Sequence, residues 1–304
     1  MTVVEARGHI PVLPAEVVTG LEPGPGKVYI DATLGGGGHA MLLLERGATV
    51  IGLDQDPMVI ARYAGKPPAG LSVVQANFRD MEAATAALLD GRPPDGVLFD
   101  LGVSSFQLDT AERGFSFHAD APLDMRMGSS GPTAAEVLEN LDVEELAEAL
   151  YRYGDERHSR RIARAIISAR DAGALTGTVA LSEVIRRAYP GGHARGIHPA
   201  RRSFQALRIL VNDELGALRN GLAAATRLLP PGGRLAVISF QSLEDRIVKQ
   251  TLRGDPAWRP LSKRPVTPSE LEQLENPRSR SAKLRVAERT GAASQPPSVP
   301  DDDA

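Results

Sequence analysis

Short apolar runs alternate with helical stretches over the first hundred residues of the chain. The apolar runs predict strands at Val28–Asp31, Thr49–Asp54, Leu71–Gln75 and Val97–Asp100. The stretches between them have helical spacing and predict helices at Ala40–Arg46, Pro57–Tyr63 and Met81–Leu89. Strands that alternate with helices form βαβ units, so the fold class is α/β with a doubly wound, Rossmann-like parallel sheet.

This alternation stops after residue 104. From about Ser105 to Arg202 no strand is predicted, and apolar residues recur at helical intervals, as at Val137, Leu138, Leu141 and Leu146. A long amphipathic helix is then expected from Phe204 to about Leu229. The stretch before that helix is therefore interpreted as a helical insertion.

The α/β pattern resumes after the long helix. Leu235–Phe240 is a continuous apolar run typical of a buried parallel strand, a helix is expected around Glu244–Leu252, and Lys283–Glu288 alternates like an edge strand. We therefore predict a split core at 1–104 and 205–290, and an inserted helical domain at 105–204. Residues 291–304, rich in Pro and Ser and ending in three aspartates before Ala304, are predicted to be a disordered tail.

Composition narrows the function classes. The chain of 304 residues has no cysteine, which excludes disulfides and thiolate chemistry and suits a reducing compartment. Its start lacks a secretory apolar core, and no run of about 18 apolar residues occurs, so a cytoplasmic protein without a membrane span is expected. No His-Glu-x-x-His motif or carboxylate cluster predicts a catalytic metal.

Charge is distributed unevenly along the chain. The formal net charge is −3, yet the segment from Arg152 to Arg208 contains twelve arginines and only four acidic residues. A local excess of arginine is the electrostatic pattern of a phosphate-binding surface, and it is also found on solvated helices.

A glycine-rich bend follows the first predicted strand. Gly35 to Gly38 are four consecutive glycines between Asp31 and His39, at the junction of that strand with the first helix. Glycines let a ligand lie against the main chain, and the helix N-terminus suits an anionic group. Gly35, Gly37 and Ala40 also satisfy the dinucleotide fingerprint, so the bend alone fits either a nicotinamide cofactor or S-adenosylmethionine.

Acidic residues at successive strand ends favour S-adenosylmethionine. Asp54 ends the second strand, where a carboxylate accepts hydrogen bonds from ribose hydroxyls. Asp31 can neutralise an amino group, Phe78 can cover an adenine, and Asp100 would lie beside the transferred methyl group. These positions are expected to converge at the carboxyl edge of one sheet, where α/β folds bind ligands.

Many longer motifs resemble one known family, the MraW/RsmH methyltransferases. The similarity runs from His9 to about Arg289 and is carried by these segments: Asp31–His39, Asp54–Pro57, Asp100–Ser105, Arg113–Phe117, Pro122–Met127, His198–Pro199, Phe204–Arg208, Val211–Asn212 and Ser239–Ile247. The chain departs from the family pattern at Phe106, where proline is common, and at Gln241, where histidine is usual.

The resemblance implies an activity and a set of binding residues. Family members transfer a methyl group from S-adenosylmethionine to N4 of a cytidine in the decoding region of 16S ribosomal RNA. The cofactor residues it implies are Gly37, Gly38, His39, Asp54, Phe78, Asp100 and Gln107. It also implies that the helical insertion recognises the substrate, which would be 16S RNA within the small ribosomal subunit. The sequence leaves open whether the chain forms a homodimer.

The expected chemistry needs a polarised amine and a base that is not paired. Asp100, with the main-chain carbonyls of Leu101–Ser104, is the candidate for polarising the amine, and Ser104 and Asn212 are weaker catalytic candidates. Phe106 is a candidate for stacking on the exposed base. The arginines predicted to contact RNA are Arg157, Arg160, Arg161, Arg164, Arg201 and Arg202.

Three other functions fit parts of this pattern. A methyltransferase that acts on DNA or a small molecule would keep the fold, although the segment that starts at Asp100 lacks the Pro-Pro-Tyr/Phe run usual in DNA amino-methylating enzymes. A noncatalytic RNA-binding factor would keep the cofactor pocket. A nicotinamide-dependent oxidoreductase would be stabilised against heat by NAD instead of S-adenosylmethionine.

Overall fold

The computed structural model describes residues 10–190 and 198–295, and the chain divides into two compact units. The core unit contains the segments up to Gly102 and from Leu215, and the helical unit spans Val103–Glu214. The return to the core therefore lies at Leu215, not at residue 205. The reason is that Phe204, Ala206 and Leu207 are buried in the apolar cluster of the helical unit.

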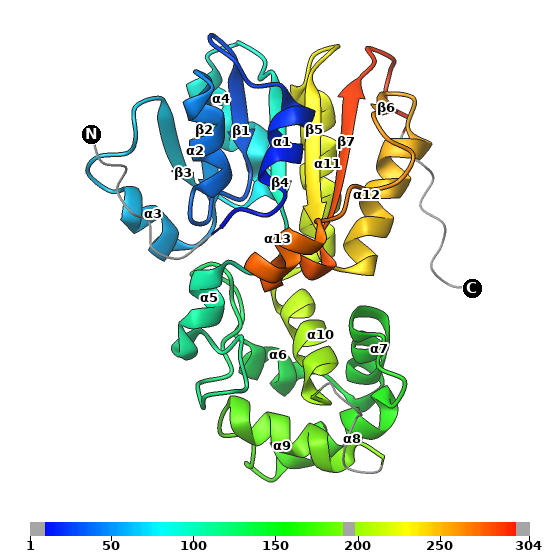
Figure 1. Ribbon diagram of the computed structural model, residues 1–304. Helices are drawn as coiled ribbons and strands as arrows, with labels where there is room; N and C mark the ends of the chain where they lie inside the picture. Colours follow the sequence, from blue (N-terminus) through cyan, green and yellow to red (C-terminus); the bar gives the residue numbers. More distant parts are fainter. Residues whose placement is uncertain (1–9, 191–197, 296–304) are drawn as a thin grey trace. The chain divides into compact units, whose positions relative to one another are not determined.

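The core unit is built on a sheet of seven strands in the order β3-β2-β1-β4-β5-β7-β6 (Figure 1). The strands β1 to β5 pair parallel with one another, and β7 pairs antiparallel with both β5 and β6. Their bounds are β1 Val28–Asp31, β2 Thr49–Asp54, β3 Leu71–Gln75, β4 Gly96–Asp100, β5 Arg234–Ser239, β6 Trp258–Pro260 and β7 Lys283–Arg289. The doubly wound α/β prediction is confirmed, and β6 is a strand that the sequence did not reveal.

Helices cover both faces of this sheet. Alternate strand residues face two apolar clusters: Ile30 and Phe99 belong to the cluster under α4, α11 and α12, whereas Tyr29 and Leu98 belong to the cluster under α1 and α2. The helices of the core unit are α1 Pro14–Leu21, α2 Gly38–Glu45, α3 Pro57–Tyr63, α4 Met81–Leu89, α11 Glu214–Leu228, α12 Ser242–Gly254 and α13 Glu270–Glu275. Burial on both sides explains why the strands are continuous apolar runs.

The helical unit contains no strand among its described residues. Its helices are α5 Ser105–Asp109, α6 Ala134–Asn140, α7 Val143–Gly154, α8 Ser159–Asp171, α9 Thr178–Ala188 and α10 Ala200–Asn212. Leu138, Leu146, Leu181 and Ile185 are buried in its own apolar cluster. The N-termini of α6 and α7 are stabilised by capping boxes, in which Thr133 and Asp142 each accept a hydrogen bond from the backbone of a glutamate three residues later.

Two sequence expectations are corrected by the fold. The long helix predicted from Phe204 to Leu229 is interrupted at Asp213, whose φ of 46° is left-handed, so α10 and α11 are separate helices. The start of the expected disordered tail is held to the core, because Asp255 accepts hydrogen bonds from the backbone N–H of Gln295 at 3.0 Å and from the hydroxyl of Ser294. The remainder of that tail lies outside the described residues.

The described part of the chain includes no helix with the length and apolar character needed to cross a bilayer. It likewise includes no group of three or more His, Cys, Asp or Glu side chains that could hold a metal ion.

Candidate active site

Three aspartates end three neighbouring strands of the core unit. Asp31 ends β1, Asp54 ends β2 and Asp100 ends β4. Because these parallel strands are adjacent in the order β2-β1-β4, their carboxyl ends meet at one edge of the sheet (Figure 1). The structure therefore brings together the strand-end carboxylates that the sequence singled out.

The bend after β1 is tied to all three strand ends. Asp54 accepts a hydrogen bond from the backbone N–H of Gly35 at 2.9 Å, and Asp31 accepts one from the backbone of Thr33 at 3.2 Å. The hydroxyl oxygen of Thr33 accepts a hydrogen bond from the backbone N–H of Asp100 at 2.6 Å. Thr33, which the sequence analysis did not single out, thus joins the bend to β4 and fixes its position over the strand ends.

Two glycines in the bend are packed closely against other residues. Gly37 has a φ of 78°, and a Cβ built on it would lie 2.2 Å from the hydroxyl oxygen of Tyr63. A Cβ on Gly38 would lie 3.2 Å from Pro11. Tyr63, the last residue of α3, therefore contacts the bend directly. Sequence reasoning missed this tyrosine because α3 carries no motif that points to Gly37.

His39 connects the bend to Asp100. The histidine is buried at the start of α2, and its Nε2 lies 2.8 Å from the carbonyl oxygen of Val12. Its Nδ1 lies 3.6 Å from Oδ2 of Asp100. The other carboxylate oxygen of Asp100, Oδ1, is buried and has no hydrogen-bond partner within the described residues. Asp100 therefore has one oxygen beside a histidine and one oxygen available to a ligand.

The site is electrostatically suited to a cation. Burial raises the pKa of Asp31 and of Asp54 to about 6 and that of Asp100 to about 7. Burial also lowers the pKa of His39, although the charge of Asp31 partly opposes that effect. Carboxylates that resist ionisation in this way release free energy when a positive group enters beside them.

Phe78 follows β3 at the same edge of the sheet. Its ring packs edge-on against Phe99, with centroids 5.4 Å apart, and its Cδ2 lies 2.9 Å from the Cβ position of Gly221. Core packing accounts for these contacts, and the predicted role of Phe78 as an adenine wall stays a prediction. Gln241, at one departure from the family pattern, lies directly before α12 and donates its backbone N–H to Glu244 at 3.0 Å.

Gln107 and Ser104 belong to the helical unit, where they bind each other. Gln107 accepts a hydrogen bond from the backbone N–H of Ser104 at 3.0 Å and donates one from its own backbone to the Ser104 hydroxyl at 3.3 Å. Its side-chain amide also donates to the carbonyl of Met127 at 3.3 Å. These contacts define the start of α5. The side chain of Phe106 lies outside the described part of the chain.

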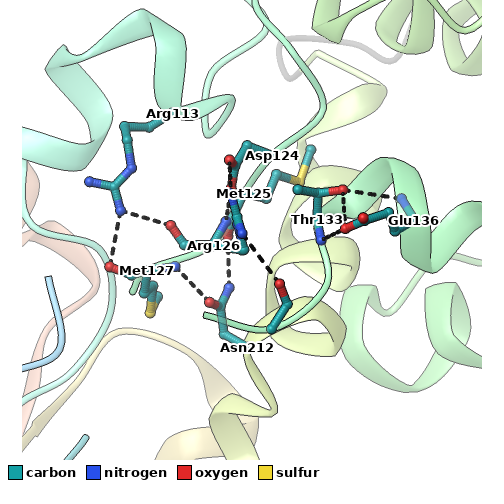
Figure 2. Close-up of polar contacts among 9 residues, drawn as sticks. Arg113, Asp124, Met125, Arg126, Met127, Thr133, Glu136 and Asn212 are labelled. Carbon is teal, nitrogen blue, oxygen red and sulfur yellow. Dashed lines mark hydrogen bonds and ion pairs between the residues drawn. The ribbon is translucent and has the colours of Figure 1, made fainter. Parts of the chain in front are cut away.

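Asn212 supports a loop of the helical unit. Its Oδ1 accepts a hydrogen bond from the backbone N–H of Met127 at 2.7 Å, and its Nδ2 donates to the carbonyl of Met125 at 2.8 Å (Figure 2). Met125 has a left-handed φ of 58°, which is a strained conformation for a side chain of this size. The amide of Asn212 thus stabilises an unfavourable turn, and its predicted catalytic role stays a prediction.

The arginines predicted to contact RNA are exposed on the helical unit. Arg157 precedes α8, Arg201 and Arg202 begin α10, and Arg202 donates to the carbonyl of Asp155 at 3.0 Å. Arg160, Arg161 and Arg164 form what we call the basic face of α8, opposite the buried Ile162, Ala163, Ile166 and Ile167. Within the described ranges, no acidic side chain pairs with any arginine of this face.

The parallel sheet, the glycine bend and the acidic strand ends define an α/β enzyme of the Rossmann-like class. Comparison with known proteins narrows the class. A model of the MraW methylase family matches residues 6–290. A ribosomal RNA small subunit methyltransferase H of Deinococcus radiodurans is 61% identical over 287 residues, covering 93% of this chain and 90% of the relative. One of the same name from Rhodospirillum centenum is 48% identical, covering 93% of each chain. A solved rRNA methylase of Streptococcus thermophilus aligns with a TM-score of 0.43 at 9% identity, covering 93% of this chain and 99% of that one.

The chain therefore belongs to the MraW methylase family. It is a methyltransferase whose methyl donor is S-adenosylmethionine. The expected family and cofactor are both confirmed.

Proposed function

We propose that this methyltransferase acts on ribosomal RNA of the small subunit, and that its acceptor is N4 of a cytidine in the decoding region of 16S RNA. The observation that carries the acceptor chemistry is Oδ1 of Asp100, which is buried and has no partner among the described residues. An exocyclic amino group donates hydrogen bonds, so it matches an unsatisfied carboxylate oxygen. The names of the relatives support the RNA class, and the motif resemblance supports the position of the nucleotide.

The strand-end residues fit the cofactor by charge and by shape. Asp31 would balance the charge of the cofactor's amino group, and amides of the glycine bend would bind its carboxylate. Asp54 would accept hydrogen bonds from its ribose hydroxyls. Gly35 and Gly37 have the positive φ values that let the backbone bend sharply here, and a main chain without side chains can approach a ligand closely. S-adenosylmethionine supplies an electrophilic methyl group on a positively charged sulfur, and that charge suits buried carboxylates.

The acceptor nitrogen must become more nucleophilic before it can attack. Its lone pair is delocalised into the cytosine ring, and a carboxylate that binds an amino hydrogen pushes electron density back onto the nitrogen. Asp100 performs this polarisation and also fixes the direction of the amine, so that positioning supplies a large share of the rate. Access to the amino group requires a nucleotide that is splayed out or single-stranded.

The helical unit is proposed to be the substrate-recognition domain. The basic face of α8 exposes three arginines without acidic partners in the described chain, and guanidinium groups bind phosphates with paired hydrogen bonds. The assembled small subunit, or its RNA, is the proposed partner.

The deciding experiment uses methyl-labelled cofactor and the variants Asp100→Asn and Asp100→Ala. With small-subunit RNA, the wild type is expected to incorporate label, and mass spectrometry should locate it on N4 of one cytidine. Both variants should lose at least a hundredfold in single-turnover rate, the lower range for a lost acid–base group, while still binding the cofactor product by calorimetry. Label on DNA or a small molecule but not on RNA would refute the acceptor. Cofactor binding without any transfer would favour a noncatalytic RNA-binding factor.

A further inference from the structure

The hydrogen bond of His39 to the main chain determines which ring nitrogen is basic. Nε2 lies 2.8 Å from the carbonyl oxygen of Val12, and a carbonyl can only accept a hydrogen bond. Nε2 therefore carries the hydrogen. In the neutral ring the other nitrogen, Nδ1, then has a free lone pair, and it faces Oδ2 of Asp100 at 3.6 Å.

Acidic side chains from three elements lie around His39. Asp31 ends β1, Asp100 ends β4, and Glu272 lies on α13, where it accepts a hydrogen bond from the backbone of Leu13 at 2.7 Å. Burial lowers the pKa of His39 overall, and the charge of Asp31, the Val12 carbonyl and the charge of Glu272 each oppose that shift. The ring is therefore neutral at rest, and these groups offset part of the cost of charging it.

We propose that His39 receives, through Asp100, the proton that the acceptor amine loses during methyl transfer. This proposal rests on the proposed function, which places an amine at Oδ1 of Asp100. As the nitrogen–carbon bond forms, the carbon–sulfur bond breaks and its electron pair goes to sulfur, which becomes a neutral thioether. The positive charge then lies on the nitrogen, whose proton moves to Asp100, and a proton on Asp100 passes to Nδ1 of His39.

This assignment keeps the charge of the site constant. Before the reaction the sulfonium carries one positive charge, and afterwards the imidazolium of His39 carries it. Passing the proton on to His39 returns Asp100 to the carboxylate form, which can again accept a hydrogen bond from an acceptor amine. The distance of 3.6 Å must shorten to hydrogen-bond length for the transfer, as catalytic contacts commonly do when substrate binds. His39 is thus a positioning residue that acts through Asp100.

Nitrogen-15 NMR tests the protonation state without relying on activity. The chain has six histidines, and His39→Gln identifies the signals of His39 by their loss. At neutral pH, with the cofactor product bound, Nε2 should carry the proton and Nδ1 should show the shift of an unprotonated nitrogen. A proton on Nδ1 would overturn the proposal whatever the acceptor is.

Kinetics of the same variant tests the proton transfer. Glutamine can keep the hydrogen bond to Val12 but has no basic nitrogen, so His39→Gln should keep the bend in place and still bind the cofactor product. Its single-turnover rate should fall at least tenfold, and the pH at which the rate is half-maximal should move, since Asp100 then accepts the proton alone. The exposed His118, changed to Gln, is the matched control and should keep the wild-type rate. An unchanged rate and pH profile in His39→Gln would refute the relay. A wild-type protein that methylates no amine would refute the proposed function instead.

Discussion

Alanine at Gly37 and at Gly35 separates backbone strain from steric exclusion in the cofactor bend. Both glycines have positive φ, 78° and 48°, so alanine at either position incurs left-handed strain. That strain is about 1–2 kcal/mol for a residue with a Cβ. The surroundings differ, because a Cβ on Gly35 has only the carbonyl oxygen of Thr33 nearby, at 3.8 Å. The stability of Gly35→Ala should therefore fall only by the strain energy.

Gly37→Ala should cost more. Its Cβ would lie 2.2 Å from the hydroxyl oxygen of Tyr63, whereas an ordinary contact needs at least about 3.4 Å. The phenol must move by more than about 1 Å, at the roughly 1–3 kcal/mol typical of overpacking. The total loss should reach about 2–5 kcal/mol, measured as the free energy of unfolding in urea. Calorimetry should show weaker binding of the cofactor product, because displacing Tyr63 disturbs the bend that is proposed to hold the cofactor.

A double-mutant cycle with Tyr63→Phe shows whether the hydroxyl is responsible. Removing that oxygen leaves the ring Cζ at 3.3 Å from the Gly37 Cβ position, which needs only a small adjustment. The double variant should therefore be more stable than the sum of the single losses predicts, by about 1–3 kcal/mol. Additive losses, or equal losses for the two alanine variants, would show that Tyr63 does not lie over Gly37.

Three further predictions concern buried charge, RNA binding and the loop of the helical unit. Asp100→Asn should stabilise the cofactor-free protein, because the difference between a folded pKa of about 7 and the ordinary 3.8 is equivalent to at most about 4 kcal/mol. The cost of burying the charged Asp100 is absent below pH 3.8 and complete above about pH 7. The gain in melting temperature of Asp100→Asn over the wild type should therefore grow from pH 5.5 to pH 8, and a gain that shrinks would contradict the raised pKa of Asp100. Neutralising the basic face of α8 should weaken RNA binding and reduce its salt slope by about 0.7–0.9 per lost phosphate contact, and an unchanged slope would show that this face is merely solvated. Asn212→Ala should lower the stability of the helical unit by about 2–4 kcal/mol, since it leaves the Met127 N–H and the Met125 carbonyl unpaired; a normal unfolding curve with a lost rate would instead support the predicted catalytic role.

The central strands were predictable because they are buried on both faces, as at Thr49–Asp54, whose four middle residues are all buried. Leu71–Gln75 also has the predicted bounds, although only Leu71 is buried in this edge strand. The break at Asp213 was not predictable, because the apolar spacing continues from α10 into α11 while a single left-handed residue redirects the chain. The short strand β6 was missed because its three residues carry too few positions to show a period.

The candidate site was predictable only where the polar residue stands at a strand end. Asp31 and Asp100 follow buried strands, and parallel topology alone places them on one edge. The environment of His39 depends on residues far apart in the chain: the Val12 carbonyl, 27 positions before it, lies at its Nε2, and the charge of Glu272 on α13 acts on its ring. Local pattern contains no signal for such pairings, so the orientation of the histidine ring had to come from the structure.

Three buried carboxylates of the core unit gather at one edge of its sheet. Burial raises the pKa of Asp31, Asp54 and Asp100 there. Their burial opposes folding, and the apolar clusters on the two faces of the sheet must offset its cost. The same burial that makes the carboxylates costly strengthens their attraction for a cationic ligand, because less water screens it. Stability lost in the free protein is therefore recovered as binding energy when the positively charged donor binds. The binding energy is smaller for the neutral thioether product, so the site can release it.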